Sequence, residues 1–176
     1  TQAVRMQESL ATALRSSGFH EPKPANVGRG ISIDVHGEIG GDAHAAVQVN
    51  ADGTVTVSMP TYGLGIDTYT TLAQVVAEGL GVQLERIDRA PWSTAQGPTD
   101  AGLGGDRGAR MITLVGTLAV RDLTEQLQTL AAELLGWDAG NAVVEDAVLR
   151  DPATGKQVAI AELAELLESN NIKRVP

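Results

Sequence analysis

Two glycine-bearing loops, each running directly into an apolar helical pattern, constrain the fold of this chain more than any other feature. The first loop covers residues 63–67 and precedes a pattern over 68–80. The second covers 99–108 and precedes a pattern that continues to residue 135. Glycine at the start of a helix lets the backbone approach a ligand, and the unpaired N–H groups of the first turn attract an anion. Two such helix starts in one small domain predict a phosphate-bearing cofactor between them.

The composition is that of a globular chain with one core. With 176 residues, 43% of them apolar, the chain fits a single domain over 1–176, in which two lobes, 1–105 and 106–176, are an option. Thirteen Lys and Arg against 22 Asp and Glu give a net charge of −9, which disfavours nucleic acid and anionic membranes as partners. No apolar run reaches the length of a bilayer span and the first residues lack a signal-peptide pattern, so we expect a cytoplasmic protein.

Metal-binding chemistry has little support in these residues. The chain contains no cysteine, so it offers no thiolate ligand, and an iron–sulfur cluster would have to sit on another chain. Asp34, His36 and Glu38 alternate along a predicted strand, with Asp42 and His44 nearby. Such a group can bind a metal, but the solvated face of an edge strand is the favoured interpretation. We therefore assign no metal ligand.

Hydrophobic periodicity predicts an α+β fold with two small sheets, each covered by helices. The predicted helices span 2–16, 68–80, 108–135 and 161–168. The predicted strands span 31–39, 46–50, 54–58, 84–90, 142–144, 147–149 and 157–160. The segment 169–176 is expected to be a loose tail. Because residues 111–120 are apolar nearly all round, we expect the first half of the third helix to be deeply buried.

The second loop matches neither common phosphate-binding fingerprint. Its glycines between 102 and 108 do not keep the Gly-x-Gly-x-x-Gly spacing, and no Gly-Lys-Ser/Thr is present, so neither a dinucleotide fold nor a P-loop is predicted. Arg107 nevertheless supplies a fork of donors that suits phosphate. The alternative is an ordinary glycine loop, with Asp106 capping the helix and Arg107 on the surface.

Several short motifs between residues 28 and 167 stand in a definite order. They are Gly-Arg-Gly-Ile at 28–31, Asp-Gly-Thr-Val-Thr-Val at 52–57, Thr-x-x-x-Gln-x-x-Ala-Glu-x-Leu-Gly at 70–81, Gly-Asp-Arg-Gly-Ala at 105–109, Val-Glu-Asp at 144–146 and Ile-Ala-Glu-Leu-Ala at 160–164. In this order they resemble the molybdopterin-binding part of the large subunit of the molybdenum hydroxylases, the family of xanthine dehydrogenase and aldehyde oxidoreductase (aldehyde oxidase).

The resemblance implies that both loops contact a molybdopterin cofactor, with the cytosine dinucleotide form as one option, and reach molybdenum only indirectly. The implied cofactor-binding residues are Gly65, Ile66, Asp67, Gly104, Gly105, Asp106, Arg107 and Gly108. No catalytic residue is implied, because the family's catalytic glutamate and first molybdopterin region have no counterpart here. The chain would therefore be part of an oxidoreductase that is inactive alone and need not hold the cofactor alone. The implied partners are the remaining molybdopterin region and the iron–sulfur and FAD subunits, with a homodimer as an option.

Three residues depart from the family's pattern and define an alternative hypothesis. Ile66 stands where the family has Gln or Thr, Asp67 where it has Gly, and Asp106 where it has Ser. A carboxylate beside a pyrophosphate costs about 1 kcal/mol or more unless a cation compensates. The first hypothesis is a molybdenum hydroxylase that oxidises an aldehyde or N-heterocycle with oxygen from water. The alternative is a non-catalytic relative that keeps the fold as a structural or binding module.

Overall fold

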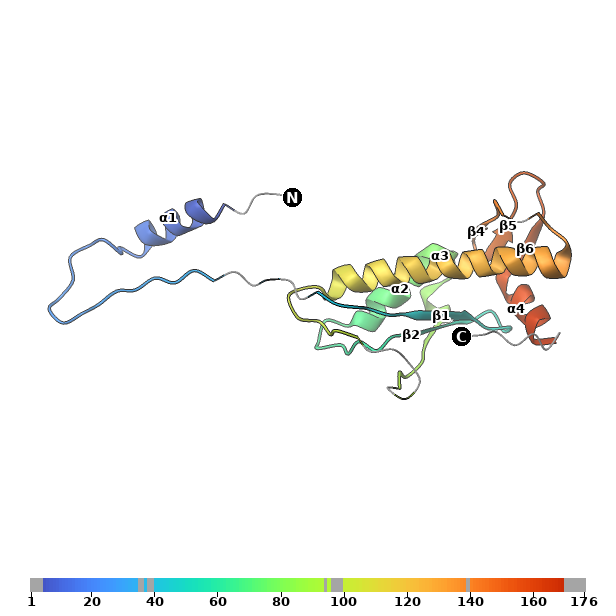
Figure 1. Cartoon of the computed structure of the whole chain (residues 1–176), viewed down its shortest axis with the longest axis horizontal. Coiled ribbons are helices and arrows are strands. Elements are labelled where there is room, and N and C mark those ends of the chain that lie inside the picture. The colour runs from blue at the N-terminus through green and yellow to red at the C-terminus, as the bar shows by residue number, and fades with distance from the viewer. Residues whose placement is uncertain are drawn as a thin grey trace. The chain divides into compact units, whose positions relative to one another are not determined.

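The chain forms two compact units, Thr1–His36 and Gly37–Pro176 (Figure 1). The computed structural model describes residues 5–34, 37, 40–93, 95, 100–138 and 140–169. The units divide at residue 36, whereas the sequence allowed two lobes that divide near residue 105. Residues on both sides of 105 belong to one hydrophobic core, which contains Val76 together with Ile112 and Leu123.

The first unit is built on one helix, α1 (Met6–Ser16), none of whose residues is buried. Gly18, with a φ of 59°, lies just beyond its end, and the guanidinium of Arg29 donates to the carbonyl of this glycine. The strand expected over 31–39 is not present at 31–34, where the backbone has no regular structure. Residues 35, 36, 38 and 39 lie outside the described part. Apolar and polar residues alternate around Ile31 and Ile33 as they do in a strand, but both isoleucines are exposed. An alternating pattern forms a stable strand only when a neighbouring strand or helix packs against it.

The first sheet of the second unit is a hairpin followed by a parallel crossover. Its strands are β1 (Ala46–Val49), β2 (Val55–Ser58) and β3 (Ile87–Arg89), in that order. The predicted hairpin is confirmed: β1 and β2 are antiparallel, and Gly53 has a positive φ in the turn. Helix α2 (Thr68–Leu80) then leads to β3, which pairs with β2 in parallel. Val55 and Val57 are fully buried in the core that α2 also supplies.

The second sheet contains β4 (Val143–Glu145), β5 (Val148–Arg150) and β6 (Gln157–Ala159), all antiparallel, and helix α4 (Ile160–Ser169) follows it. This sheet meets the end of α2 closely. Gly81 ends α2 with a φ of 64°, and a Cβ there would overlap the backbone nitrogen of Asp146. The N–H of Ala147 donates to the carbonyl of Leu80 at 2.9 Å. The two sheets are thus joined through the last turn of α2.

Helix α3 (Gly108–Leu135) lies alongside α2 and runs the length of the second unit (Figure 1). The helix predicted over 108–135 is confirmed, with Ile112, Leu123, Leu127 and Leu130 buried on one side, and a Cβ at Gly116 would lie 3.0 Å from Leu72. The expectation that its first half is deeply buried is wrong: Leu114 is 49% and Leu118 41% exposed. Only one side of α3 packs on α2 and the sheet, and among the described residues nothing covers the other side. No described helix is long and apolar enough to cross a bilayer.

Candidate functional site

The two helix starts lie at one edge of the first sheet. Strands β2 and β3 are parallel neighbours, so their carboxyl ends meet at the same edge. The chain leaves β2 through residues 59–67 to reach α2, and leaves β3 through residues 90–107 to reach α3. In open sheets of this kind, ligands bind outside the carboxyl ends of the parallel strands. The topology therefore brings together the two loops that the sequence predicted to lie around one ligand.

Direct contacts join the two loops. A Cβ at Gly108, the first residue of α3, would lie 2.9 Å from the Cδ1 of Ile66. The hydroxyl of the buried Thr61 donates to Asp100 at 2.9 Å, and the other carboxylate oxygen of Asp100 accepts from the N–H of Gly102 at 2.6 Å. Side chains from both loops thus fix the geometry of this edge.

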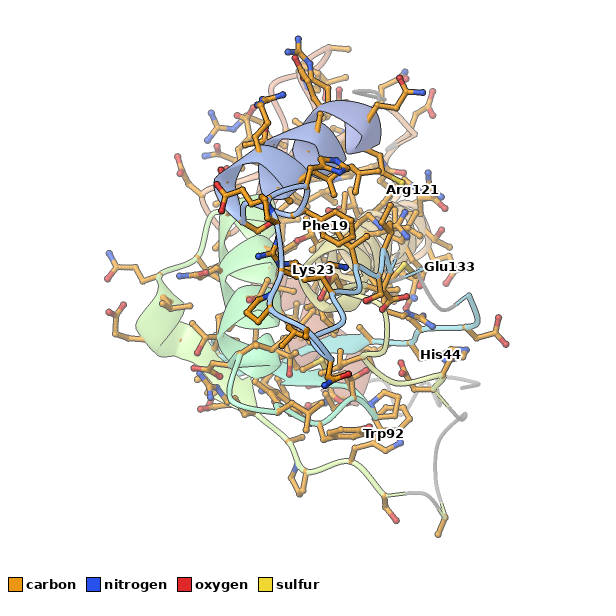
Figure 2. All side chains as sticks on the ribbon, turned by 90° about the vertical axis from the view of Figure 1, so that its left-hand side faces the viewer. Phe19, Lys23, His44, Trp92, Arg121 and Glu133 are labelled. Atoms are coloured by element: carbon orange, nitrogen blue, oxygen red, sulfur yellow. The ribbon has the colours of Figure 1, made fainter. Side chains whose placement is uncertain are left out.

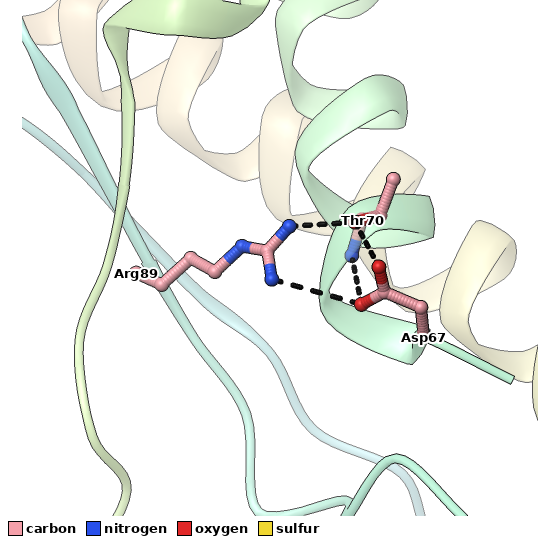
Figure 3. Close-up of polar contacts among 3 residues, drawn as sticks. All are labelled: Asp67, Thr70 and Arg89. Carbon is pink, nitrogen blue, oxygen red and sulfur yellow. Dashed lines mark hydrogen bonds and ion pairs between the residues drawn. The ribbon is translucent and has the colours of Figure 1, made fainter. Parts of the chain in front are cut away.

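The start of α2 is capped by a carboxylate of its own chain. Asp67 has a φ of 44° and accepts hydrogen bonds from Thr70 N (3.3 Å) and Thr70 Oγ1 (2.5 Å). The guanidinium of Arg89, at the end of β3, donates to Thr70 Oγ1 at 2.6 Å and lies 3.6 Å from Asp67 (Figure 3). The side-chain and backbone hydrogen bonds from Thr70, and then the charge of Arg89, lower the pKa of Asp67 below its usual 3.8. An anion already occupies this helix start.

The guanidinium of Arg107 is hydrogen-bonded to backbone carbonyls. Its side chain is 2% exposed, and its guanidinium donates to the carbonyls of Gly40 (3.2 Å), Gly41 (2.9 Å) and Asp42 (3.1 Å). The alternative that placed Arg107 on the surface is therefore wrong. Its contact with a cofactor stays a prediction. What the geometry shows is that Arg107 holds the segment 40–42 beside the start of α3.

The start of α3, unlike that of α2, has no side-chain cap at its N-cap residue. Its N-cap position is Arg107, and no side chain caps the helix, so Asp106 does not act as the cap that the alternative assumed. Asp106 is exposed with a φ of 57°, while Gly105 and Gly108 are buried and Gly104 is half-buried. The first N–H groups of a helix have no partner inside it. Among the described residues, no side-chain cap competes with an external anion at this helix start.

Gly65 and Ile66 form the exposed tip of the first loop. Gly65 has a φ of 80° and open space where a Cβ would lie, and Ile66 is 56% exposed. Tyr62 and Leu64 on the same loop are 60% and 70% exposed. The tip is therefore apolar and presents no side-chain donor at position 66.

Three buried polar atoms among the described residues have no hydrogen-bond partner: Thr68 Oγ1, His44 Nδ1 and Trp92 Nε1. Thr68 is the first residue of α2 and is 2% exposed. His44 precedes β1 and Trp92 follows β3 in the chain. Figure 2 labels both side chains. A buried hydroxyl without a partner costs free energy, and the start of a loop-bearing helix is a place where a ligand could supply that partner.

The group of histidines and acids considered for a metal is described only in part. His36 and Glu38 lie outside the described residues, Asp34 is exposed and His44 is half-buried. Within the described ranges, no group of three or more potential ligands comes together.

Sequence reasoning missed the residues that connect the loops. Thr61 and Asp100 stand 39 positions apart, and Thr70 and Arg89 stand 19 apart. Each pair depends on the parallel pairing of β2 and β3. A parallel crossover predicted between the strands at 54–58 and 84–90 would have been the signal, because it places the residues after both strands together.

The fold and this edge define a domain that presents two helix starts to one ligand, and the comparisons identify the family. A model of the molybdopterin cofactor-binding domain family matches residues 7–175. The chain therefore belongs to this family. The resemblance seen in the sequence is confirmed, as is the α+β fold.

Similar proteins are much longer than this chain. The aldehyde oxidoreductase molybdenum-binding subunit PaoC of Escherichia coli O157:H7 is 28% identical over 148 residues, covering 79% of this chain and 20% of that protein. The 6-hydroxypseudooxynicotine dehydrogenase complex subunit gamma of Paenarthrobacter nicotinovorans is 28% identical over 151 residues, covering 86% of this chain and 18% of that protein. The chain thus spans a fifth or less of the length of these relatives.

Solved structures agree with the family assignment. Quinoline 2-oxidoreductase from Pseudomonas putida 86 superposes with a TM-score of 0.62 at 25% identity, covering 76% of this chain and 17% of that one. Reconstituted CO dehydrogenase from Oligotropha carboxidovorans superposes with a TM-score of 0.58 at 26% identity, covering 68% and 15%.

Proposed function

We propose that this chain forms one wall of the cofactor site of a molybdenum hydroxylase that oxidises an aldehyde or an N-heterocycle, and that it is inactive alone. The observation that carries the proposal is the meeting of the two loops at the carboxyl ends of β2 and β3, in a chain of the molybdopterin-binding family. The names of the relatives, an aldehyde oxidoreductase subunit and a quinoline oxidoreductase, support the substrate classes.

The residues at the start of α3 fit an anionic part of the cofactor. The helix lacks a side-chain cap, so backbone N–H groups at Gly108 and Ala109 are the donors we assign. Arg107 holds the adjacent segment 40–42 and so positions this helix start. When bound, the cofactor supplies the molybdenum at which oxidation occurs. Its pyrophosphate, in a dinucleotide form such as the cytosine one, would lie at this helix start.

The start of α2 fits an anion less well, because Asp67 and Arg89 satisfy one another there. We propose that this loop forms part of the surface of the site. Gly65 and the exposed Ile66 line the site without donating a side-chain hydrogen bond. The partners in this proposal are the remaining molybdopterin-binding region and iron–sulfur and FAD subunits, in a cytoplasmic complex.

A glycine substitution tests the assignment at α3. Gly108→Ala places a methyl group 2.9 Å from Cδ1 of Ile66 and 3.2 Å from Cδ2 of Leu103, both at movable ends of side chains, so the fold should tolerate it, and the displaced side chains would change the shape of the proposed site. We expect the assembled complex to lose most of its bound pterin, measured by fluorescence after release. Gly136→Ala, at the open end of α3, is the control and should retain pterin. Equal pterin in Gly108→Ala and wild type would contradict the assignment.

The internal cap at Asp67 favours a second candidate, a non-catalytic relative that keeps the fold as a binding module. The two candidates differ in one measurable property. The hydroxylase retains pterin when assembled with its partner subunits, whereas the module has none in any assembly.

A further inference from the structure

Asp100 connects the two loops of the candidate site through both of its carboxylate oxygens. One oxygen accepts a hydrogen bond from the hydroxyl of Thr61, on the connection from β2 to α2, at 2.9 Å. The other accepts from the N–H of Gly102, in the second loop, at 2.6 Å. Thr61 is 3% exposed and Asp100 is half-buried, so water competes little for the bond between them. The carboxylate therefore fixes the distance between Thr61 and the second loop.

The second loop is itself fastened to the segment 40–42 at two places. The N–H of Ala101 donates to the carbonyl of Asp42 at 3.2 Å, and the guanidinium of Arg107 donates to all three carbonyls of the segment. The packing is close here, since a Cβ at Gly41 would lie 2.4 Å from the Cβ of Ala101. Any change in the distance between the two loops must therefore shift this segment as well.

The hydrophobic core does not hold the two loops together. Among the described residues, the core cluster contains no member of 60–67 or 100–107. The apolar contact between the loops, where Ile66 meets Gly108, involves the movable end of a side chain and is non-directional. A hydrogen bond, in contrast, requires a donor–acceptor distance of about 2.9 Å. The separation of the loops thus depends on the bond between Thr61 and Asp100 more than on packing.

We propose that Asp100 is a positioning residue, which sets the separation of the two loops and so the place of the α3 start relative to the first loop. It acts through Thr61 and Gly102 and is not itself a ligand of the cofactor. Its consequence, retention of the pterin, rests on the proposed function. Without the carboxylate, the Thr61 hydroxyl and the Gly102 N–H lose their partners, and the second loop relaxes away from the first while the core stays intact.

Four substitutions separate the geometry of Asp100 from its charge. Asp100→Ala removes both bonds, and Asp100→Glu keeps the charge but moves the carboxylate one methylene further out. Asp100→Asn removes the charge and keeps both bonds, because the amide oxygen can accept from Gly102 and the amide nitrogen can donate to the hydroxyl oxygen of Thr61. Thr61→Val removes the hydroxyl with little change in shape.

The rate at which the assembled complex releases pterin, measured by fluorescence of the dialysate, tests the proposal. Asp100→Ala, Asp100→Glu and Thr61→Val should each speed release about tenfold, the effect of losing one hydrogen bond to a charged group. Asp100→Asn should match wild type, as should the control Asp138→Ala at an exposed carboxylate beyond α3. The double variant Thr61→Val/Asp100→Ala should be no faster than Asp100→Ala alone, because both changes remove the same bond. Release at the wild-type rate from Asp100→Ala, or equally fast release from Asp100→Asn and Asp100→Ala, would overturn the proposal.

Amide hydrogen exchange in the full chain without cofactor gives a second readout. The Ala101 amide, bonded to Asp42, should exchange about tenfold faster in Asp100→Ala and Asp100→Glu than in wild type or Asp100→Asn. The Ala147 amide, bonded to Leu80, should exchange alike in all four chains. Faster exchange at both amides would show that Asp100 supports the whole fold and would overturn the proposal. A wild-type complex without pterin would contradict the proposed function instead, and equal exchange at Ala101 in all four chains would then overturn the positioning role separately.

Discussion

At the start of α2, the carboxylate of Asp67 takes the place that an external anion takes at many helix starts. Thr70 holds it there by hydrogen bonds, and the guanidinium of Arg89 lies 3.6 Å from it. Because the pKa of Asp67 is lowered from 3.8, the charged form stabilises the folded chain above that pH. The contribution is lost as the pH falls through the folded-state pKa.

Asp67→Asn should therefore destabilise the chain at neutral pH and leave its stability nearly unchanged at pH values below the lowered folded-state pKa of Asp67. Asn keeps an oxygen that can cap α2, so the difference in stability between wild type and variant measures the effect of the negative charge on Asp67. Thermal unfolding of both proteins from pH 2 to pH 7 measures the difference in unfolding temperature between wild type and variant, which is the gap compared below. Asp106→Asn, at an exposed carboxylate that caps no helix, is the control for the loss of one negative charge. A gap for Asp67→Asn that is constant with pH would contradict this account.

Replacing Arg107 should destabilise the chain even when no cofactor is present. Its guanidinium satisfies three carbonyls in a buried setting, and charge-assisted hydrogen bonds of this kind contribute about 1.5–3 kcal/mol each without being additive. We expect Arg107→Ala to lower the free energy of unfolding by about 3 kcal/mol in urea titrations. Arg107→Lys should recover only part, since an ammonium lacks the fork. A loss for Arg107→Ala below about 0.5 kcal/mol would contradict the stabilising role assigned to these three hydrogen bonds.

At the scale of elements, the last turn of α2 is the joint between the two sheets. Gly81 and Gly136 end α2 and α3 with nearly the same φ, 64° and 65°, but only Gly81 lies against the backbone of Asp146. Gly136→Ala should cost about 1–2 kcal/mol, the strain of a left-handed residue. Gly81→Ala should cost at least twice that, because its methyl group would also overlap a backbone. Equal losses of unfolding free energy in the two variants would mean that the sheets are not joined there.

The elements that sequence predicted well are those whose signal is local. The periodicity of α2 and α3 and the glycines that end them required no knowledge of neighbours, and both helices are found. The strand expected around Ile33 and the burial expected at Leu114 and Leu118 failed because each depends on a partner surface. The loops of the candidate site were predicted from their glycines. The pair formed by Thr61 and Asp100 was not, since only the fold brings them together.

At the scale of the molecule, a chain that covers a fifth or less of its relatives leaves apolar surface uncovered. Leu64, Ile66, Leu114 and Leu118 are all more than 40% exposed. Exposed apolar patches drive association, so we expect a homodimer or a complex with other subunits at working concentrations. Analytical ultracentrifugation should show species larger than 18.3 kDa. A monomer at high concentration, alone and with the partner subunits, would count against this.

The isolated chain should also show no substrate-dependent dye reduction with aldehydes or N-heterocycles. In the proposed function, its residues provide one wall of the cofactor site and no catalytic group. Turnover by the purified chain would contradict its assignment as part of a larger enzyme.

The molybdenum content of the assembled complex tests the central claim most directly. The chain is expressed together with the subunits encoded beside it, purified as a complex, and analysed for metal by mass spectrometry. The account predicts one molybdenum per copy of this chain, and a large loss in the Gly108→Ala variant but not in Gly136→Ala. A complete complex that contains no molybdenum would contradict the account and identify the chain as a binding module.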